Sequence, residues 1–188
     1  GVVDEELNKQ KPESHGISLI NLESGDMKLL YSVKDISEIK QEQSMEGAFH
    51  FITHSLFNKS DSRFYFLHRW LIKSGRIFTR MITTDINGDN LFIFPTNGMV
   101  SHIAWKNNSQ IMAYCSLKDE GDNYVLFTDQ KDEYTVIGKN EFTSDGHPSF
   151  NPANEDVFIT DSYPDRYRYS HLFMFDINKN RKYNLAKL

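Results

Sequence analysis

Three histidines recur along the 188-residue chain, and each is followed three positions later by a large aromatic residue. The pairs are His54 with Phe57, His102 with Trp105 and His147 with Phe150. Neutral imidazoles that face one another can hold a divalent metal ion, and protonated ones can bind a carboxylate. The alternative is that each histidine has a structural role in a repeat and bonds to the backbone of the next unit.

The histidine motif repeats with a period of about 45 residues, which is typical of β-propeller blades. A polar turn and a short apolar run follow each motif. A second repeat consists of hairpin-like strand pairs, each with an Asn or Asp near the end of its first strand. These residues are Asn21, Asp85, Asp129 and Asp176. Together the two repeats predict units of four antiparallel strands.

The predicted fold is all-β: a partial β-propeller of about three and a half four-stranded blades. A half blade is expected at 15–31, an insertion at 32–53, and complete blades at 54–95, 101–138 and 146–186. One or two helical turns are expected at 35–43, and a loop at 1–14. A propeller ring usually has about four to eight blades. Further blades from a longer chain or another copy are therefore expected.

The composition argues against several classes of partner. The formal net charge is −5, so no broad electrostatic attraction to nucleic acid or to an anionic membrane is expected. No apolar stretch approaches the roughly 18 residues of a membrane helix. The single cysteine, Cys115, lies in an apolar run and is expected to be a buried thiol. With no disulfide and no signal-peptide pattern, a cytoplasmic location is predicted.

Charged and aromatic side chains gather at predicted strand ends, where propellers place binding loops. Arginine can clamp a carboxylate through two hydrogen bonds, and Trp and Tyr can stack on sugar faces. This mixture favours an acidic sugar as ligand; the alternative for the loop at 161–170 is an ordinary exposed polar loop. The predicted substrate-binding residues are His54, His68, Arg69, Trp70, Tyr163 and Arg166. Asp145 directly precedes Gly146-His147, and Asp161 lies two positions before Tyr163.

Several of these motifs together resemble the oligogalacturonate lyases and, more distantly, TolB-type propellers. The motifs are FLHRW at 66–70, RIFTRMITTDINGDN at 76–90, SHIAW at 101–105, GHPSF at 146–150 and ITDSYPD at 159–165. The resemblance covers residues 50–186. It implies a seven-bladed propeller with a manganese ion held in its channel by His and Gln ligands. It also implies an arginine base for β-elimination from pectic oligosaccharides.

The resemblance assigns roles to individual residues. Arg80 resembles the family's base, and His102 resembles the histidine one strand later, so both are predicted to be catalytic. His147, in its Gly-His context, resembles a metal ligand. His68 resembles the histidine that ends the preceding strand, although Arg69-Trp70 follows it where the family has an acidic residue, Gly and Pro.

The remaining family ligands, a Gln and two closely spaced histidines, have no match before Leu188. The predicted function is β-elimination on uronate oligosaccharides with Mn²⁺ or another divalent metal. The residues of this sequence supply only some of the ligands of that metal site. In that chemistry a positive group on the uronate carboxylate stabilises the developing charge while a base takes the neighbouring proton. The alternative is a non-catalytic propeller that binds acidic sugars or a protein partner.

Overall fold

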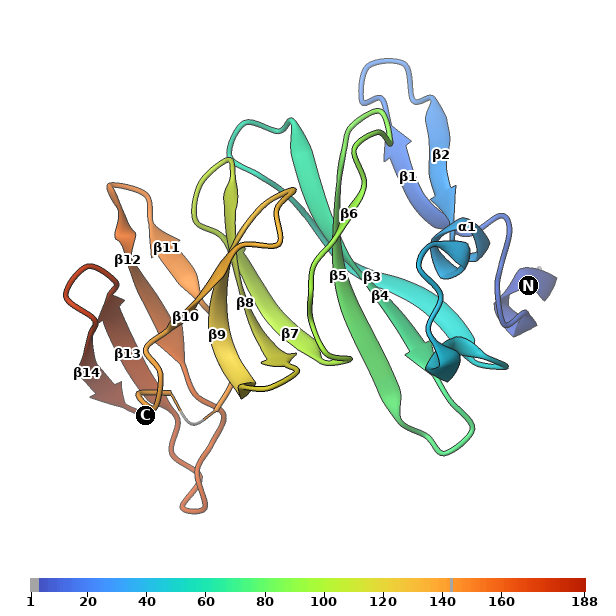
Figure 1. Cartoon of the computed structure of the whole chain (residues 1–188). Coiled ribbons are helices and arrows are strands. Elements are labelled where there is room, and N and C mark those ends of the chain that lie inside the picture. The colour runs from blue at the N-terminus through green and yellow to red at the C-terminus, as the bar shows by residue number, and fades with distance from the viewer. Residues whose placement is uncertain (1–3, 143) are drawn as a thin grey trace. The chain divides into compact units, whose positions relative to one another are not determined.

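The computed structural model describes residues 4–142 and 144–188 and is all-β with a few short helices (Figure 1). The described residues form one two-stranded and three four-stranded antiparallel sheets. Neighbouring strands in each sheet follow chain order, as in the blades of a propeller. The predicted all-β, partial-propeller fold is thus confirmed.

The chain divides into two compact units. The first comprises the residues up to Phe57 together with Ser62–Ile93, and the second comprises Asn58–Asp61 together with Phe94–Leu188. The elements of the first are η1 (Glu5–Asn8), β1 (Gly16–Ile20), β2 (Met27–Ser32), α1 (Val33–Glu38), η2 (Gln43–Met45), β3 (Phe49–Phe57), β4 (Arg63–Leu71), β5 (Ile77–Asp85) and β6 (Phe92–Ile93). Those of the second are β7 (Val100–Trp105), β8 (Gln110–Leu117), β9 (Gly121–Thr128), β10 (Tyr134–Ile137), β11 (Ser149–Asn151), β12 (Asn154–Asp161), β13 (His171–Asp176) and β14 (Arg181–Lys187).

The middle strands of the sheets are buried along continuous runs. Every residue from Phe64 to His68 in β4 and from Ile111 to Cys115 in β8 is buried. These strands are covered on both faces, which explains their uninterrupted apolar runs in the sequence. Cys115 is a free, buried thiol, as predicted, and burial raises its pKa to about 12.

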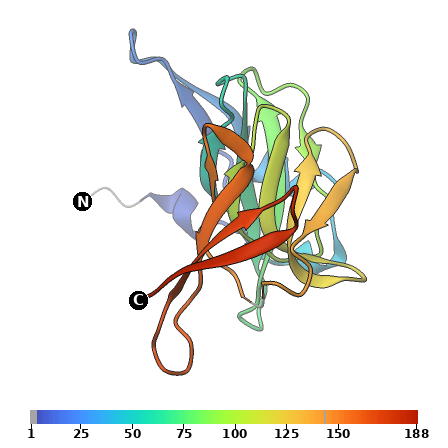
Figure 2. The same cartoon turned by 90° about the vertical axis from the view of Figure 1, so that its left-hand side faces the viewer.

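The core of the second unit lies between its two four-stranded sheets. Met112 and Tyr124 of one sheet pack in the same buried cluster as Phe158 and Phe175 of the other. Aromatic and β-branched side chains fit such pleated, two-sided packing. In the view of Figure 2, the loop that joins β12 to β13 extends beyond the ends of these strands.

Three expectations for the N-terminal part need correction. The segment 32–53 is not wholly an insertion, because β3 begins at Phe49 and pairs Phe49–Thr53 with Leu67–Leu71 of β4. The predicted helix at 35–43 is displaced: α1 spans Val33–Glu38 and ends before the separate 3₁₀ turn η2. Within 1–14, expected to be a loop, Glu5–Asn8 form a 3₁₀ turn capped by Asp4.

The position of α1 is explained by a capping box that the sequence reading overlooked. The Ser32 hydroxyl accepts from the Asp35 backbone N–H at 3.0 Å, and Asp35 accepts from the Ser32 backbone N–H at 2.9 Å. These bonds satisfy orphan donors of the first helical turn. The hydrogen bonds from Ser32 also lower the pKa of Asp35.

Two of the repeated histidines lie at matching irregularities. The pairing register of β3 shifts between Thr53 and Leu56, and that of β7 shifts between Val100 and Ile103. His54 and His102 each lie within these shifts. Such β-bulges change the direction of side chains and are frequent beside binding sites.

Candidate functional site

A cluster of five side chains in the second unit brings together most of the chemistry that the sequence indicated there. His102 lies in the bulge of β7, Asp145 and His147 precede β11, and Asp161 is the last residue of β12. Tyr163 follows in the loop to β13. We call these five residues the histidine cluster.

The three rings of the histidine cluster lie close to one another. The ring centroids of His102 and His147 are 4.1 Å apart, with an interplanar angle of 59°. The Tyr163 ring is 6.2 Å from that of His102 and 6.1 Å from that of His147. Two of the three repeated histidines therefore meet within one unit.

Each imidazole of the cluster is held by its own carboxylate. His102 Nδ1 lies 3.0 Å from Asp145 Oδ2, and the Ser101 hydroxyl donates to the same oxygen. His147 Nδ1 lies 2.9 and 3.0 Å from the two oxygens of Asp161. The His147 backbone N–H also donates to Asp161 Oδ1 at 2.7 Å. These contacts fix the orientation of both rings.

The same contacts affect the charge of Asp161. Burial alone would raise the pKa of this carboxyl, but the hydrogen bonds from the backbone and ring of His147 outweigh burial and lower it. Asp161 is therefore an ionised acceptor for the Nδ1 proton of His147. An imidazole that donates from Nδ1 presents Nε2 to a ligand.

The cluster is open to ligands. The side chains of His102 and His147 are 26% and 61% exposed, and Tyr163 is 55% exposed. Across residues 4–142 and 144–188, no group of three or more His, Cys, Asp or Glu is arranged to hold a metal ion. The two imidazoles alone do not fit a manganese site. The described residues offer no further ligands for a metal ion bound at His147, the role that the resemblance implies for it.

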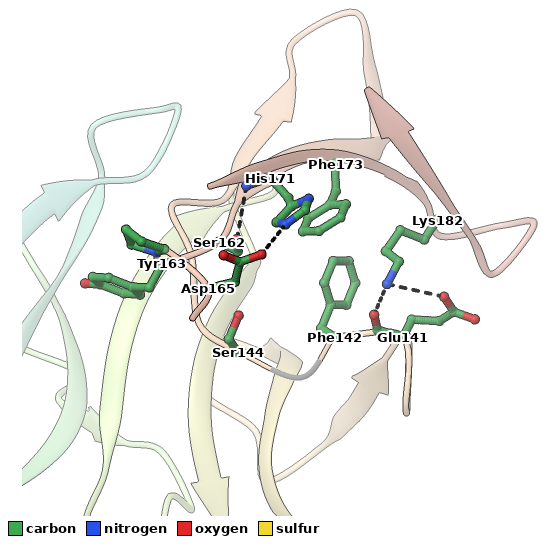
Figure 3. Close-up of a pocket in the computed structure, with 10 residues that line it drawn as sticks. Glu141, Phe142, Ser144, Ser162, Tyr163, Asp165, His171, Phe173 and Lys182 are labelled. Atoms are coloured by element: carbon green, nitrogen blue, oxygen red, sulfur yellow. Dashed lines mark hydrogen bonds and ion pairs between the residues drawn. The ribbon is translucent and has the colours of Figure 1, made fainter. Parts of the chain in front are cut away.

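A pocket of about 390 Å³ adjoins the cluster through Tyr163, which lines it. Figure 3 shows Phe142 and Phe173 in the middle of this pocket, with His171 and Asp165 on one side and Lys182 and Glu141 on the other. Ser144, Ser162 and Pro164 complete the lining. We call it the Phe142 pocket.

The remaining predicted site residue of the second unit, Arg166, lies in the β12–β13 loop. Its guanidinium is 4.7 Å from the centroid of the Tyr167 ring, and both residues are exposed. This contact is with Tyr167 and not with the histidine cluster, so the sugar-binding role of Arg166 stays a prediction.

In the first unit, Arg80 is buried, with 3% of its surface exposed. Its guanidinium donates to the backbone oxygens of Ile36, Ile39 and Lys40 at 2.8–3.0 Å, and therefore binds the C-terminal end of α1. Its Nε donates to His68 Nδ1 at 3.0 Å. Burial lowers the Arg80 pKa to about 10. This position gives Arg80 a structural role and leaves very little of its surface open to a substrate.

His68 continues this buried network to His50. His68 Nε2 lies 2.9 Å from His50 Nδ1, and His50 Nε2 lies 3.4 Å from the Met45 carbonyl oxygen. Because Arg80 Nε can only donate, His68 carries its proton on Nε2 and donates it to His50. His50 then donates to Met45. Burial, and then the nearby Arg80 charge, lower the His68 pKa to about 2, so the imidazole is neutral.

The predicted sugar-stacking residue Trp70 is also inside the first unit. It is fully buried, stacks on Phe78 at 5.6 Å and donates its indole N–H to the Ser44 hydroxyl. A sugar cannot reach this ring, so the predictions for Trp70 and for His68, which is equally buried, are wrong in this structure. Trp70 is buried because Met45 and Ala48 pack against it in one cluster.

Two further predicted residues of the first unit have different surroundings. Arg69 is half-buried, and its Nε is a buried donor without a hydrogen-bond partner. His54 is exposed and adopts a left-handed backbone conformation with φ of 54°. Both residues belong to the first unit, and their sugar-binding roles stay predictions.

The sequence reading named Asp145 and Asp161 as neighbours but gave them no role, and it missed Phe142, Phe173 and Lys182. Asp145-Gly146-His147 was a usable signal, since a carboxylate so near a histidine can orient it. Lys182 carries no motif, because it reaches the pocket only through the pairing of β13 with β14.

Comparisons with known proteins support the fold alone. No protein-family model matches the chain, and no curated protein sequence matches it. Among solved structures, the fold is similar to that of a chain in the crystal structure of the tricorn protease, with a TM-score of 0.54 and 12% sequence identity. The similarity covers 94% of this chain and 21% of that chain, and it supports a propeller-like fold.

No helix in the described part of the chain is long and apolar enough to cross a membrane.

Proposed function

We propose that this chain is part of a carbohydrate-active β-propeller that binds an acidic oligosaccharide at the histidine cluster. The observation that supports this most is the pair of imidazoles 4.1 Å apart, each held at Nδ1 by its own carboxylate, beside the exposed ring of Tyr163. On each ring Nε2 lies away from the carboxylate that binds Nδ1, and the aromatic ring adds a stacking face.

The binding mode follows from the hydrogen-bond arrangement. The carboxylate on Nδ1 orients each ring so that Nε2 faces the ligand, where an N–H donates to the carboxylate of a uronate ring. Tyr163 packs on the apolar face of the ring or bonds its hydroxyls. The chain's net charge of −5 gives no long-range attraction to such a ligand, so the affinity depends on these local contacts.

A second candidate function, elimination of the kind that the lyase resemblance implies, is favoured by the Asp145–His102 contact. In its neutral form His102 takes the proton next to the uronate carboxylate. The electron pair of that C–H bond forms the new carbon–carbon double bond, the neighbouring carbon–oxygen bond breaks, and the leaving oxygen takes a proton from water. The buried Arg80 has no part in this step, and the manganese ion and seven-bladed ring stay predictions of the resemblance.

The test is a titration with oligogalacturonates, followed by NMR and calorimetry, on the wild type and on His102→Ala and His147→Ala. Loss of a charge-assisted hydrogen bond is expected to weaken binding about tenfold or more in each variant. His15→Ala is the matched control, because His15 forms an exposed pair with Asp4 in the first unit at 2.7 Å. Its affinity is expected to equal that of the wild type.

If no uronate binds the wild type, or if both cluster variants bind as well as the His15 control, the proposal is wrong. Elimination is followed separately, through the ultraviolet absorbance of the unsaturated product. If uronates bind but no such product forms, the protein is a binding module for acidic sugars and the proposed elimination activity is wrong.

A further inference from the structure

The Phe142 pocket has a rigid aromatic floor. Phe142 packs against Tyr124 at 5.0 Å and Phe175 at 5.4 Å, both of which belong to the buried core of the second unit. The Phe173 ring meets Phe142 edge-on at 6.2 Å with an interplanar angle of 78°. Two partly exposed rings anchored to a core in this way offer a fixed apolar surface to a ligand.

One wall of the pocket carries a positioned ammonium group. Lys182 Nζ lies 5.4 Å from the Phe142 centroid and 5.1 Å from the Phe173 centroid, and the side chain is only 22% exposed. The group donates to the Glu141 backbone oxygen, whereas the Glu141 carboxylate lies 3.7 Å away, beyond hydrogen-bond distance. An ammonium has three N–H donors, so Lys182 keeps donors for a ligand.

The opposite wall of the pocket is polar and contains hydrogen-bonding side chains. The His171 ring stacks parallel to Phe173, with centroids 6.0 Å apart and an interplanar angle of 8°. Its Nε2 lies 3.4 Å from Asp165 Oδ2, and its backbone N–H donates to the Ser162 hydroxyl at 3.1 Å. The pocket therefore combines an apolar floor with hydrogen-bonding groups around the rim.

These features discriminate between classes of ligand. A phosphate is disfavoured, because it carries more negative charge than a uronate and the lining has one lysine, no arginine and two carboxylates. An organic cation is disfavoured, because Lys182 already occupies the position over both rings. A purely apolar ligand would leave the charged walls unpaired. A sugar ring with a carboxylate satisfies the floor, the rim and the ammonium together, and a volume of about 390 Å³ accommodates one ring.

We propose that the Phe142 pocket is a second sugar subsite, which binds the uronate ring next to the ring held by the histidine cluster. Tyr163 lines the pocket and its ring is 6.1 Å from that of His147, so one oligosaccharide can occupy both places. Lys182 binds the carboxylate of the second ring, and Phe142 and Phe173 pack on its apolar face. This inference rests on the proposed function of the histidine cluster and deepens it.

The test compares galacturonate with trigalacturonate on the wild type and on Lys182→Met, which keeps an unbranched side chain, one atom shorter, and removes its charge. The wild type is expected to bind the trimer more tightly than the monomer. In Lys182→Met the trimer affinity should fall about tenfold, while monomer binding at the histidine cluster stays unchanged. Lys187→Met is the matched control, because Lys187 is in the same strand and lies over Tyr169 at 3.8 Å, away from the pocket.

Each result of this test has a defined meaning. Unchanged trimer affinity in Lys182→Met, or an equal loss for monomer and trimer, overturns the second subsite and leaves the proposed function standing. Failure of both sugars to bind the wild type overturns both proposals. If Lys182→Met does not fold, His171→Gln on the opposite wall replaces it, with the same selective loss of trimer affinity expected and with unchanged trimer affinity as the overturning result.

Discussion

Arg80 is the residue whose environment departs most from its predicted role. Its three guanidinium nitrogens make four hydrogen bonds, three to backbone oxygens at the end of α1 and one to His68. The planar arrangement of five N–H donors makes these bonds possible at once, and an ammonium cannot reproduce it. The residue therefore fastens α1 to the sheet of the first unit.

Replacing Arg80 by lysine is expected to destabilise the protein. Arg80→Lys leaves buried acceptors unsatisfied and should lower the free energy of unfolding by about 2–4 kcal/mol. Urea denaturation measures the change. Arg76→Lys is the control, because the Arg76 guanidinium lies over Phe78 at the surface, and it should stay within about 0.5 kcal/mol of the wild type. An Arg80→Lys variant as stable as the wild type would contradict the structural role.

At the same scale, the repeat accounts for the approach of His102 to His147. Both stand three residues before an aromatic residue in successive repeats, and the repeat carries them to neighbouring strand ends. The aspartates that orient the rings were harder to assign, because their role depends on side-chain direction. His50 was not placed, since its partner His68 is reached only through the pairing of β3 with β4.

At the scale of elements, the approach of His147 to β12 depends on Gly146. A Cβ at this position would collide with the backbone oxygen of Asp161 and approach the Thr160 hydroxyl. The absence of a side chain therefore lets the segment before β11 lie against the end of β12. The hydrogen bond from the His147 backbone to Asp161 requires this closeness.

Gly146→Ala is accordingly expected to push His147 away from Asp161. The strain should lower the free energy of unfolding by about 1–3 kcal/mol, and binding of uronates at the histidine cluster should weaken. Thermal unfolding and the NMR titration measure the two effects. Ser149→Ala, at an exposed position in β11, should change neither. Wild-type stability and affinity in Gly146→Ala would show that the backbone contact is unimportant.

At the scale of the molecule, the repeat in the sequence was enough to predict four-stranded antiparallel sheets. Strand alternation and turn residues are local properties, so they can be read without knowing tertiary contacts. The start of β3 and the burial of Trp70 and His68 could not be read in this way, because they depend on which residues of the 32–53 segment cover β4. Met45 and Ala48 form a buried cluster with Trp70, a contact between distant positions that no periodicity shows.

The overall stability is expected to depend on pH through His68 and His50. Burial lowers the pKa of both imidazoles, that of His68 from 6.5 to about 2. Below pH 6.5 the unfolded chain binds protons that the folded chain does not, so unfolding is favoured as the pH falls. His68 alone should remove about 2 kcal/mol of stability between pH 7.5 and 5.

Urea denaturation at both pH values checks this dependence. His68→Gln, which can still accept from Arg80, should flatten it, whereas His15→Gln, an exposed substitution outside the network, should leave it as in the wild type. A stability that is the same at pH 5 and 7.5 in the wild type would refute the prediction.

The buried chain from Arg80 through His68 and His50 to Met45 has a further consequence. All its hydrogen bonds run in the same direction, because the arginine can only donate a hydrogen bond and the carbonyl oxygen can only accept one. To carry an extra proton through it, both rings would have to turn over inside a packed interior. The arrangement therefore does not transfer protons and serves to hold the packed segments together. The contact between the two histidines is not evidence of a proton relay.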